Sequence, residues 1–229
     1  MKLFAHRGYS ARYPENTMEA FQKAYEKGFD GIETDVHMTK DGRLVLIHDE
    51  TIDRTSNGQG YIYDYTYEEL KEFSFGNGQP GFYALPLLED LLSFMQNHPI
   101  KVNIELKTDV IHYENIEKKV WELVNQYGVA QDIYYSSFYL PSLLRMKELD
   151  SNAYLGYLIE DQYTQKYQEL MKYQIAAFHP EYTLLNEKRM AELKKNHIFV
   201  VSWTAPDFHE YQRLKELGVD IIISNEYLR

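Results

Sequence analysis

The stretch NTMEAFQKAYEKGFDGIETDVH, residues 16–37, contains one complete helix followed by one strand. Asn16 precedes an amphipathic segment and has a glutamate three residues on, which predicts a helix capped by Asn16. Gly28 predicts the end of that helix. The apolar, β-branched run over residues 31–37 then predicts a buried strand. The fold depends on how often this unit recurs along the chain.

The same rhythm recurs over the whole chain. Apolar runs are found at residues 2–6, 31–37, 102–107, 133–137, 154–158, 175–179, 199–203 and 219–223. Helix-length amphipathic stretches lie between most of them, with start signals at Thr66, Pro141, Asn186 and Asp207. This alternation predicts a parallel sheet with helical crossovers. Eight units without a break in composition favour a closed (β/α)₈ TIM barrel over an open sheet, and we expect one α/β catalytic domain over residues 1–229.

A β-hairpin is expected directly after the second strand. Asp41-Gly42 lies between two apolar runs, which is the strongest short hairpin signal. If these two residues form the loop, His48 lies opposite Asp35. Alternation along the strand puts Glu33 and His37 on the same face. One short segment would therefore present two carboxylates and an imidazole on a common surface.

The connection over residues 49–85 is much longer than an ordinary loop between a strand and a helix. It predicts a small insertion over the barrel end where the second strand stops. Tyr61, Tyr63, Tyr65 and Tyr67 alternate within it, which favours a tyrosine-rich strand packed on the barrel. The alternative is that these rings stack on a cationic substrate headgroup.

Composition excludes several classes of protein. The 229 residues are 44% hydrophobic and 26% charged, as in globular domains. A net charge of −11 argues against nucleic acid as a partner, and the absence of cysteine excludes disulfides and thiol chemistry. No apolar run approaches membrane-spanning length and no secretory signal is visible, so we expect a cytoplasmic protein without stable membrane insertion. The oligomeric state is left open.

The predicted strands end in residues that can do chemistry, and in a barrel of this class active sites lie at those ends. The candidates are His6, Arg7, Glu33, Asp35, His48, Glu105, Lys107 and Trp203. Three carboxylates without cysteine suit one hard divalent cation, Mg²⁺ or Ca²⁺. Arginine and lysine beside such a cation suit a phosphoryl group. Two histidines can divide proton removal and proton donation between them.

Taken in order, these residues resemble the glycerophosphodiester phosphodiesterase family. The resemblance begins at His6-Arg7-Gly8 with Pro14-Glu15-Asn16-Thr17, and continues at Glu33-Thr34-Asp35-Val36, Thr39-Lys40-Asp41-Gly42, His48-Asp49, Leu85-Pro86-Leu87-Leu88-Glu89, Glu105-Leu106-Lys107 and Trp203-Thr204. It covers nearly the whole chain. Near the C-terminus the family often has Thr-Asp where this chain has Ser224-Asn225.

The resemblance implies a TIM barrel that cleaves glycerophosphodiesters to glycerol 3-phosphate and an alcohol. It implies metal ligands at Glu33, Asp35 and Glu105, acid and base at His6 and His48, and phosphate binding by Arg7 and Lys107. The glycerol 2-hydroxyl would attack phosphorus, and water would open the resulting cyclic phosphate.

Two other functions stay open at this point. One is a lipid phosphodiesterase on the same barrel, of lysophospholipase D or phosphatidylinositol type. The other, more remote, is a binding barrel without catalysis. The order of the candidate residues favours the glycerophosphodiesterase, because a barrel that only binds needs no such set.

Overall fold

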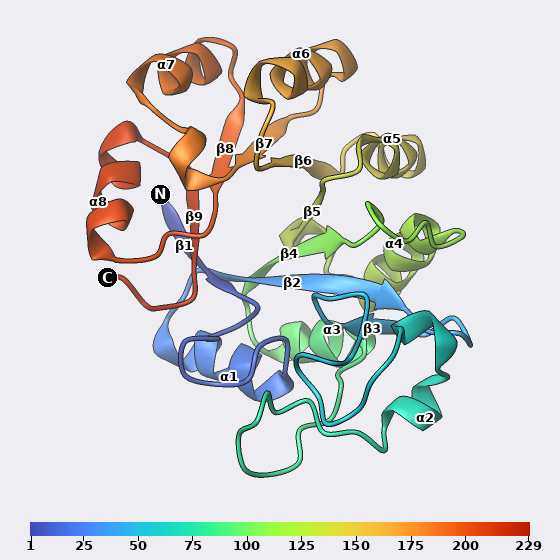
Figure 1. The fold of residues 1–229 in the computed structure, drawn as a ribbon. Coiled ribbons are helices and arrows are strands. Elements are labelled where there is room, and N and C mark those ends of the chain that lie inside the picture. Colours follow the sequence, from blue (N-terminus) through green and yellow to red (C-terminus); the bar gives the residue numbers. More distant parts are fainter.

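The computed structural model describes all residues from Met1 to Arg229 and contains a closed parallel barrel (Figure 1). Its ring strands are β1 (Lys2–His6), β2 (Gly31–Met38), β4 (Lys101–Leu106), β5 (Ile133–Ser137), β6 (Tyr154–Ile159), β7 (Ala177–Pro180), β8 (Phe199–Ser202) and β9 (Ile221–Ser224). The ring closes because β1 pairs in parallel with both β2 and β9. Each predicted apolar run overlaps one ring strand, and the predicted TIM barrel is confirmed.

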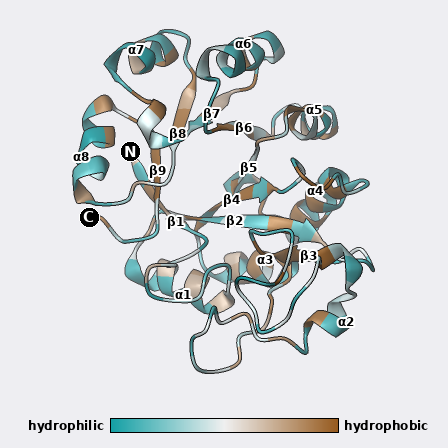
Figure 2. Cartoon of the chain, viewed as in Figure 1, coloured by the Kyte–Doolittle hydropathy of each residue, from teal (hydrophilic) through white to brown (hydrophobic).

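Seven helices connect consecutive ring strands and cover the outside of the barrel. They are α1 (Met18–Lys27), α3 (Leu88–Asn97), α4 (Ile116–Tyr127), α5 (Leu140–Leu149), α6 (Tyr163–Tyr173), α7 (Glu187–Lys195) and α8 (Phe208–Leu217). In Figure 2 strands such as β8 and β9 are mostly hydrophobic, β2 with its acidic residues is mostly teal to white, and the helices carry hydrophilic residues on their outer sides. A cluster of 43 buried residues joins the two layers. None of the helices has the length and apolar character needed to cross a membrane.

The helix boundaries follow the predicted signals with one exception. Gly28 ends α1 with φ of 93°, in the left-handed region that favours glycine. The side chains of Asn186 and Asp207 accept from the backbone at the starts of α7 and α8. The cap of α1, however, is Thr17, whose hydroxyl accepts from the backbone of the third helical residue. The prediction that Asn16 caps this helix is wrong, because its side chain is used in the active-site region described below.

Strand β3 (Leu44–Leu46) pairs antiparallel with β2 and lies outside the ring. The hairpin is present, but its predicted register is wrong by one residue. A backbone hydrogen bond closes the loop within Thr39–Arg43, leaving three residues at the tip instead of two. Ile47 therefore lies opposite Asp35, to whose carbonyl it donates. His48 still reaches the barrel mouth, because β3 ends before it and strand alternation no longer directs its side chain.

The segment over residues 49–85 has a small core of its own beside β3. It contains the 3₁₀ helix η1 (Ile62–Asp64) and the short helix α2 (Tyr67–Leu70). Thr66 forms the predicted capping box of α2. The core consists of Val45, Ile47, Ile52, Ile62, Leu70, Phe75, Leu85 and Leu87. The predicted tyrosine-rich strand is absent, because η1 and α2 occupy its place.

The interior of the barrel leaves no space beside Gly31 at the start of β2. A methyl group there would lie 2.4 Å from the ring of Phe4, which is fully buried. We predict that Gly31→Ala lowers the free energy of unfolding by about 1–3 kcal/mol through overpacking, measured by urea titration. In a Phe4→Leu background the same substitution should cost less. An equal cost in both backgrounds would contradict this steric explanation.

Candidate active site

A cavity of about 490 Å³ lies at the C-terminal ends of the ring strands. It brings together seven of the eight candidate residues, which are His6, Arg7, Glu33, His48, Glu105, Lys107 and Trp203. The eighth, Asp35, is 1% exposed and lies beside Glu105 in the β2–β4 register. The cavity therefore has the location that the barrel fold predicts for an active site.

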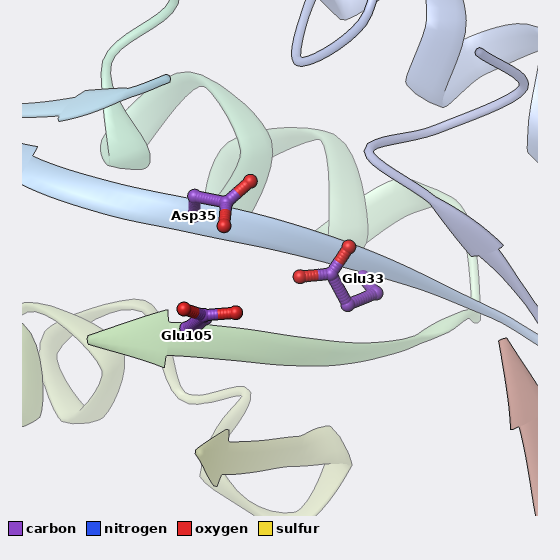
Figure 3. Close-up of side chains that lie close together, drawn as sticks. All are labelled: Glu33, Asp35 and Glu105. Carbon is purple, nitrogen blue, oxygen red and sulfur yellow. The ribbon is translucent and has the colours of Figure 1, made fainter. Parts of the chain in front are cut away.

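Three carboxylates form the centre of this site. Glu33 and Asp35 project from β2 and Glu105 from β4, and Figure 3 shows their carboxylates facing a common space. One oxygen of each lies within 4.8 Å of the others, and all three side chains are buried. The cluster arises because β2 and β4 are adjacent and Asp35 pairs with Glu105, while Glu33 is two residues earlier on the same face.

Burial makes this cluster electrostatically costly in the absence of a cation. Burial, together with repulsion from Asp35 and Glu105, raises the pKa of Glu33 well above its ordinary value of 4.5. Burial also raises the pKa of Glu105. For Asp35 burial opposes ionisation, but Arg7, His48 and Lys107 hold its pKa well below the ordinary range. One buried oxygen of Asp35 has no hydrogen-bond partner. This donor set fits a hard divalent cation.

Two cations lie against the carboxylates. Lys107 donates to Glu105 at 3.0 Å and is 6% exposed. Although burial disfavours its charge, Glu105 and Asp35 raise the pKa of Lys107. The guanidinium of Arg7 lies 3.5 Å from Asp35 and 2.9 Å from Glu15. Both cations line the cavity, so they can face an anionic group bound there.

The two histidines have different hydrogen-bond partners. Nδ1 of His6 lies 2.6 Å from the amide oxygen of Asn225. Because that oxygen only accepts, Nδ1 carries the proton and Nε2 is left with a lone pair. Burial, followed by the charge of Arg7, lowers the pKa of His6 to about 4. Nδ1 of His48 instead lies 2.7 Å from the carboxylate of Asp49, and its Nε2 faces Lys107.

Comparison with known proteins agrees with this geometry. The sequence model of the glycerophosphoryl diester phosphodiesterase family matches residues 6–228. The glycerophosphodiester phosphodiesterase of Caldanaerobacter subterraneus subsp. tengcongensis is 34% identical over 227 residues, covering 98% of this chain and 93% of that protein. The chain belongs to this family. The interpretation of the sequence as a phosphodiesterase is confirmed.

Solved structures of the family share the fold over nearly its whole length. An Oleispira antarctica phosphodiesterase in complex with the product sn-glycerol-3-phosphate has a TM-score of 0.89 and 26% identity, covering 98% of this chain and 93% of that one. The glycerophosphodiester phosphodiesterase of Thermotoga maritima has a TM-score of 0.81 and 29% identity, covering 99% and 95%.

Asn16 also belongs to the active site, although the sequence predicted only a helix cap at this position. Its side chain donates to Asp35 at 2.9 Å and accepts from the hydroxyl of Thr34 at 2.7 Å, and it is 3% exposed. It therefore fixes the orientation of one carboxylate. An asparagine before a helix is typical of a cap. The contact between Asn16 and Asp35 joins residues 19 positions apart, so no local sequence pattern indicates it.

The departure from the family pattern at Ser224-Asn225 has a structural consequence. Asn225 accepts from His6 and, at 3.1 Å, from the hydroxyl of Ser10. The residue that the family often has as aspartate is here the neutral partner of His6. The sequence marked the position as unusual, and the structure connects it directly to the proposed acid–base group.

The rest of the cavity lining comes from loops, from ring strands and from α6. The indole of Trp203 donates to the carbonyl of His179 at 2.7 Å and packs edge-on against Phe138. The remaining lining residues are Glu50, Asn103, Asp109, Leu158, Glu160, Asp161, Lys166 and Ile223. Sequence reasoning did not select the charged loop residues Glu50, Asp109, Glu160 and Asp161, because isolated charges in loops are typical of solvated surface.

Other residues considered from the sequence lie away from the cavity. His37 shares the inward face of β2 as expected, but it is fully buried between the hydroxyl of Tyr113 and the carbonyl of His48. Tyr61 and Tyr63 stack on each other with their rings 5.1 Å apart and remain 46% and 40% exposed. None of the four alternating tyrosines lines the cavity.

The raised pKa of Glu33 predicts a pH dependence of stability in the metal-free protein. Its stabilising effect is present below the ordinary value of 4.5 and is lost as pH rises through the higher folded pKa. The contribution of Glu33 to stability in EDTA should therefore fall as pH rises, whereas buried His6 and His37, whose pKa values are lowered to about 4, contribute in the opposite direction. Because glutamine still accepts from the Arg7 backbone, Glu33→Gln should be about 1–2 kcal/mol more stable than wild type at pH 8.

Urea titration of both proteins in EDTA at pH 5 and pH 8 measures this effect. The buried histidines also change stability in this range, but they are present in both proteins, so the difference between the two pH slopes isolates Glu33. Identical pH slopes for the wild type and Glu33→Gln would show that Glu33 is not the group responsible.

Proposed function

We propose that this enzyme hydrolyses glycerophosphodiesters to sn-glycerol 3-phosphate and an alcohol. The observation that carries the proposal is the convergence of three carboxylates, two cations and two histidines on one cavity. Each group meets one need of phosphodiester cleavage. The similar Oleispira antarctica phosphodiesterase in complex with sn-glycerol-3-phosphate supports the identity of the product.

In this proposal Glu33, Asp35 and Glu105 hold one divalent cation, Mg²⁺ or Ca²⁺. When bound, the cation supplies positive charge to the phosphoryl oxygens and to the attacking hydroxyl. Asn16 keeps Asp35 in position for this role, and the backbone amide of Arg7 does the same for Glu33 at 3.1 Å.

Arg7 and Lys107 neutralise the phosphate as negative charge develops on it. Both side chains are largely buried and held by carboxylates, so they need little reorganisation when substrate binds. Trp203 offers an apolar wall against which the carbon skeleton of the substrate packs.

His6 is suited to the role of general base and His48 to that of general acid. As Nε2 of His6 takes the proton of the glycerol 2-hydroxyl, that oxygen attacks phosphorus, and the bond to the leaving alcohol breaks as His48 donates a proton. Water then opens the cyclic phosphate with the two roles reversed. The carboxylate of Asp49 holds Nδ1 of His48, whereas Nδ1 of His6 lies on the amide of Asn225 and its Nε2 lies 3.9 Å from Glu33.

The proposed enzyme consists of a single catalytic domain. Residues 1–229 would act as one catalytic domain, with the segment 49–85 as its insertion. A cytoplasmic location and the absence of a nucleic-acid partner remain predictions from the sequence.

Release of sn-glycerol 3-phosphate from glycerophosphocholine and glycerophosphoethanolamine tests the reaction. We expect release with added Mg²⁺ or Ca²⁺ and none in excess EDTA, because the buried carboxylates cannot hold the phosphate without a cation. Absence of release with either ion, when lysophospholipids are cleaved, would favour the lipid phosphodiesterase. Absence of turnover on all of them would favour a binding barrel.

Substitution of the histidines separates catalysis from metal binding. His6→Gln and His48→Gln should each lower kcat by about 10²–10⁴-fold, because each removes one proton-transfer group, while the Kd for the cation changes little. Steady-state kinetics and calorimetric metal titration measure the two effects. Exposed His209→Gln, with the same chemical change, serves as control. Near-normal turnover in either site variant would remove that histidine from the mechanism.

A further inference from the structure

The floor of the cavity contains a buried amide oxygen without a partner. Asn103 of β4 is 3% exposed and lines the cavity. Its Nδ2 donates to the hydroxyl of Ser136 on β5 at 2.8 Å. Its Oδ1 is buried and accepts no hydrogen bond. A buried acceptor without a hydrogen bond lowers the stability of the fold by about 1–3 kcal/mol. We therefore expect a bound species to donate a hydrogen bond to this oxygen.

The strand register places this oxygen next to the carboxylate cluster. Asn103 pairs with Glu33, and two residues later Glu105 pairs with Asp35. Because side chains alternate along a strand, all four face the barrel interior. Two adjacent strands thus present a block of four oxygen-bearing side chains, of which only three are carboxylates.

The length of the side chain indicates how the amide takes part. Asparagine is one methylene shorter than the glutamate beside it, and its Nδ2 is occupied by Ser136 on the far side. Divalent cations of this class keep water molecules among their ligands. Such a water has two protons to donate, one of which can meet an oxygen deeper in the barrel.

We propose that Oδ1 of Asn103 accepts a hydrogen bond from a water molecule bound to the divalent cation. Asn103 is then a positioning residue of the metal centre, and this role rests on the cation site of the proposed function. The partners of ligands and bound waters change metal affinity by about 10–100-fold when they are removed, so the effect is measurable without substrate.

Calorimetric titration of the metal-free protein with Ca²⁺ and with Mg²⁺ tests the proposal. Asn103→Leu removes the oxygen at similar volume, and Asn103→Ala is the second variant in case leucine does not fold. We expect a 10–100-fold higher Kd in either variant. Asn103→Asp, which keeps an acceptor at the same place, should restore Kd to within a few-fold of wild type.

Ser136→Ala is the matched control, because it removes the link between β4 and β5 but retains the amide oxygen. It should raise Kd less than three-fold. An equal loss in Ser136→Ala and Asn103→Leu would show a merely structural role and overturn the proposal. An unchanged Kd for the cation in a folded Asn103 variant would also overturn the proposal. If such a variant showed only a higher KM for glycerophosphocholine, the amide would contact the substrate and not the metal-bound water.

Failure of the proposed function gives a different result. If wild type binds neither ion, the cation site itself is absent and the assignment of Glu33, Asp35 and Glu105 fails. If wild type binds an ion and releases glycerol 3-phosphate while the Asn103 variants bind it equally well, only the role of Asn103 is lost.

Discussion

The pairing of β2 with β4 is the constraint on which the site depends. It places Asp35 directly beside Glu105, with Glu33 on the same face, and confines three acidic side chains to a space that water hardly reaches. Like charges in such a place repel strongly, since burial weakens the screening that water provides. The surrounding residues offset this repulsion: Lys107 contacts Glu105, while Arg7 and Asn16 contact Asp35.

The insertion, residues 49–85, contributes directly to the charge network of the site. Arg54 forms ion pairs at 2.8 Å with both Glu15 and Asp49. Glu15 in turn holds Arg7, and Asp49 contacts His48. A single side chain of the insertion therefore connects a phosphate-binding candidate with a proton-transfer candidate. The small core that residues 49–85 form with β3 holds the backbone of the insertion in place, and so positions Arg54 more firmly than a flexible loop would.

Sequence predicted the barrel well because its strands are apolar runs bounded by caps, and such patterns are local. It predicted the candidate residues because strand ends converge in this fold. The hairpin register failed because one additional loop residue shifts all pairs, and a pattern does not count loop residues. Asn16 and Asn103 were missed for another reason. Their roles come from partners on other strands, and asparagine is equally common in caps and loops.

The two histidines of the cavity differ mainly in the hydrogen-bond partner of Nδ1. Both have Nδ1 occupied, so both present Nε2 to the reaction space. The difference lies in the partner of Nδ1, which is an amide for His6 and a carboxylate for His48. An aspartate at position 225 would remove this asymmetry, because each ring would then have an anionic partner. The amide of Asn225 thus contributes to the proposed division of roles, although it does not line the cavity.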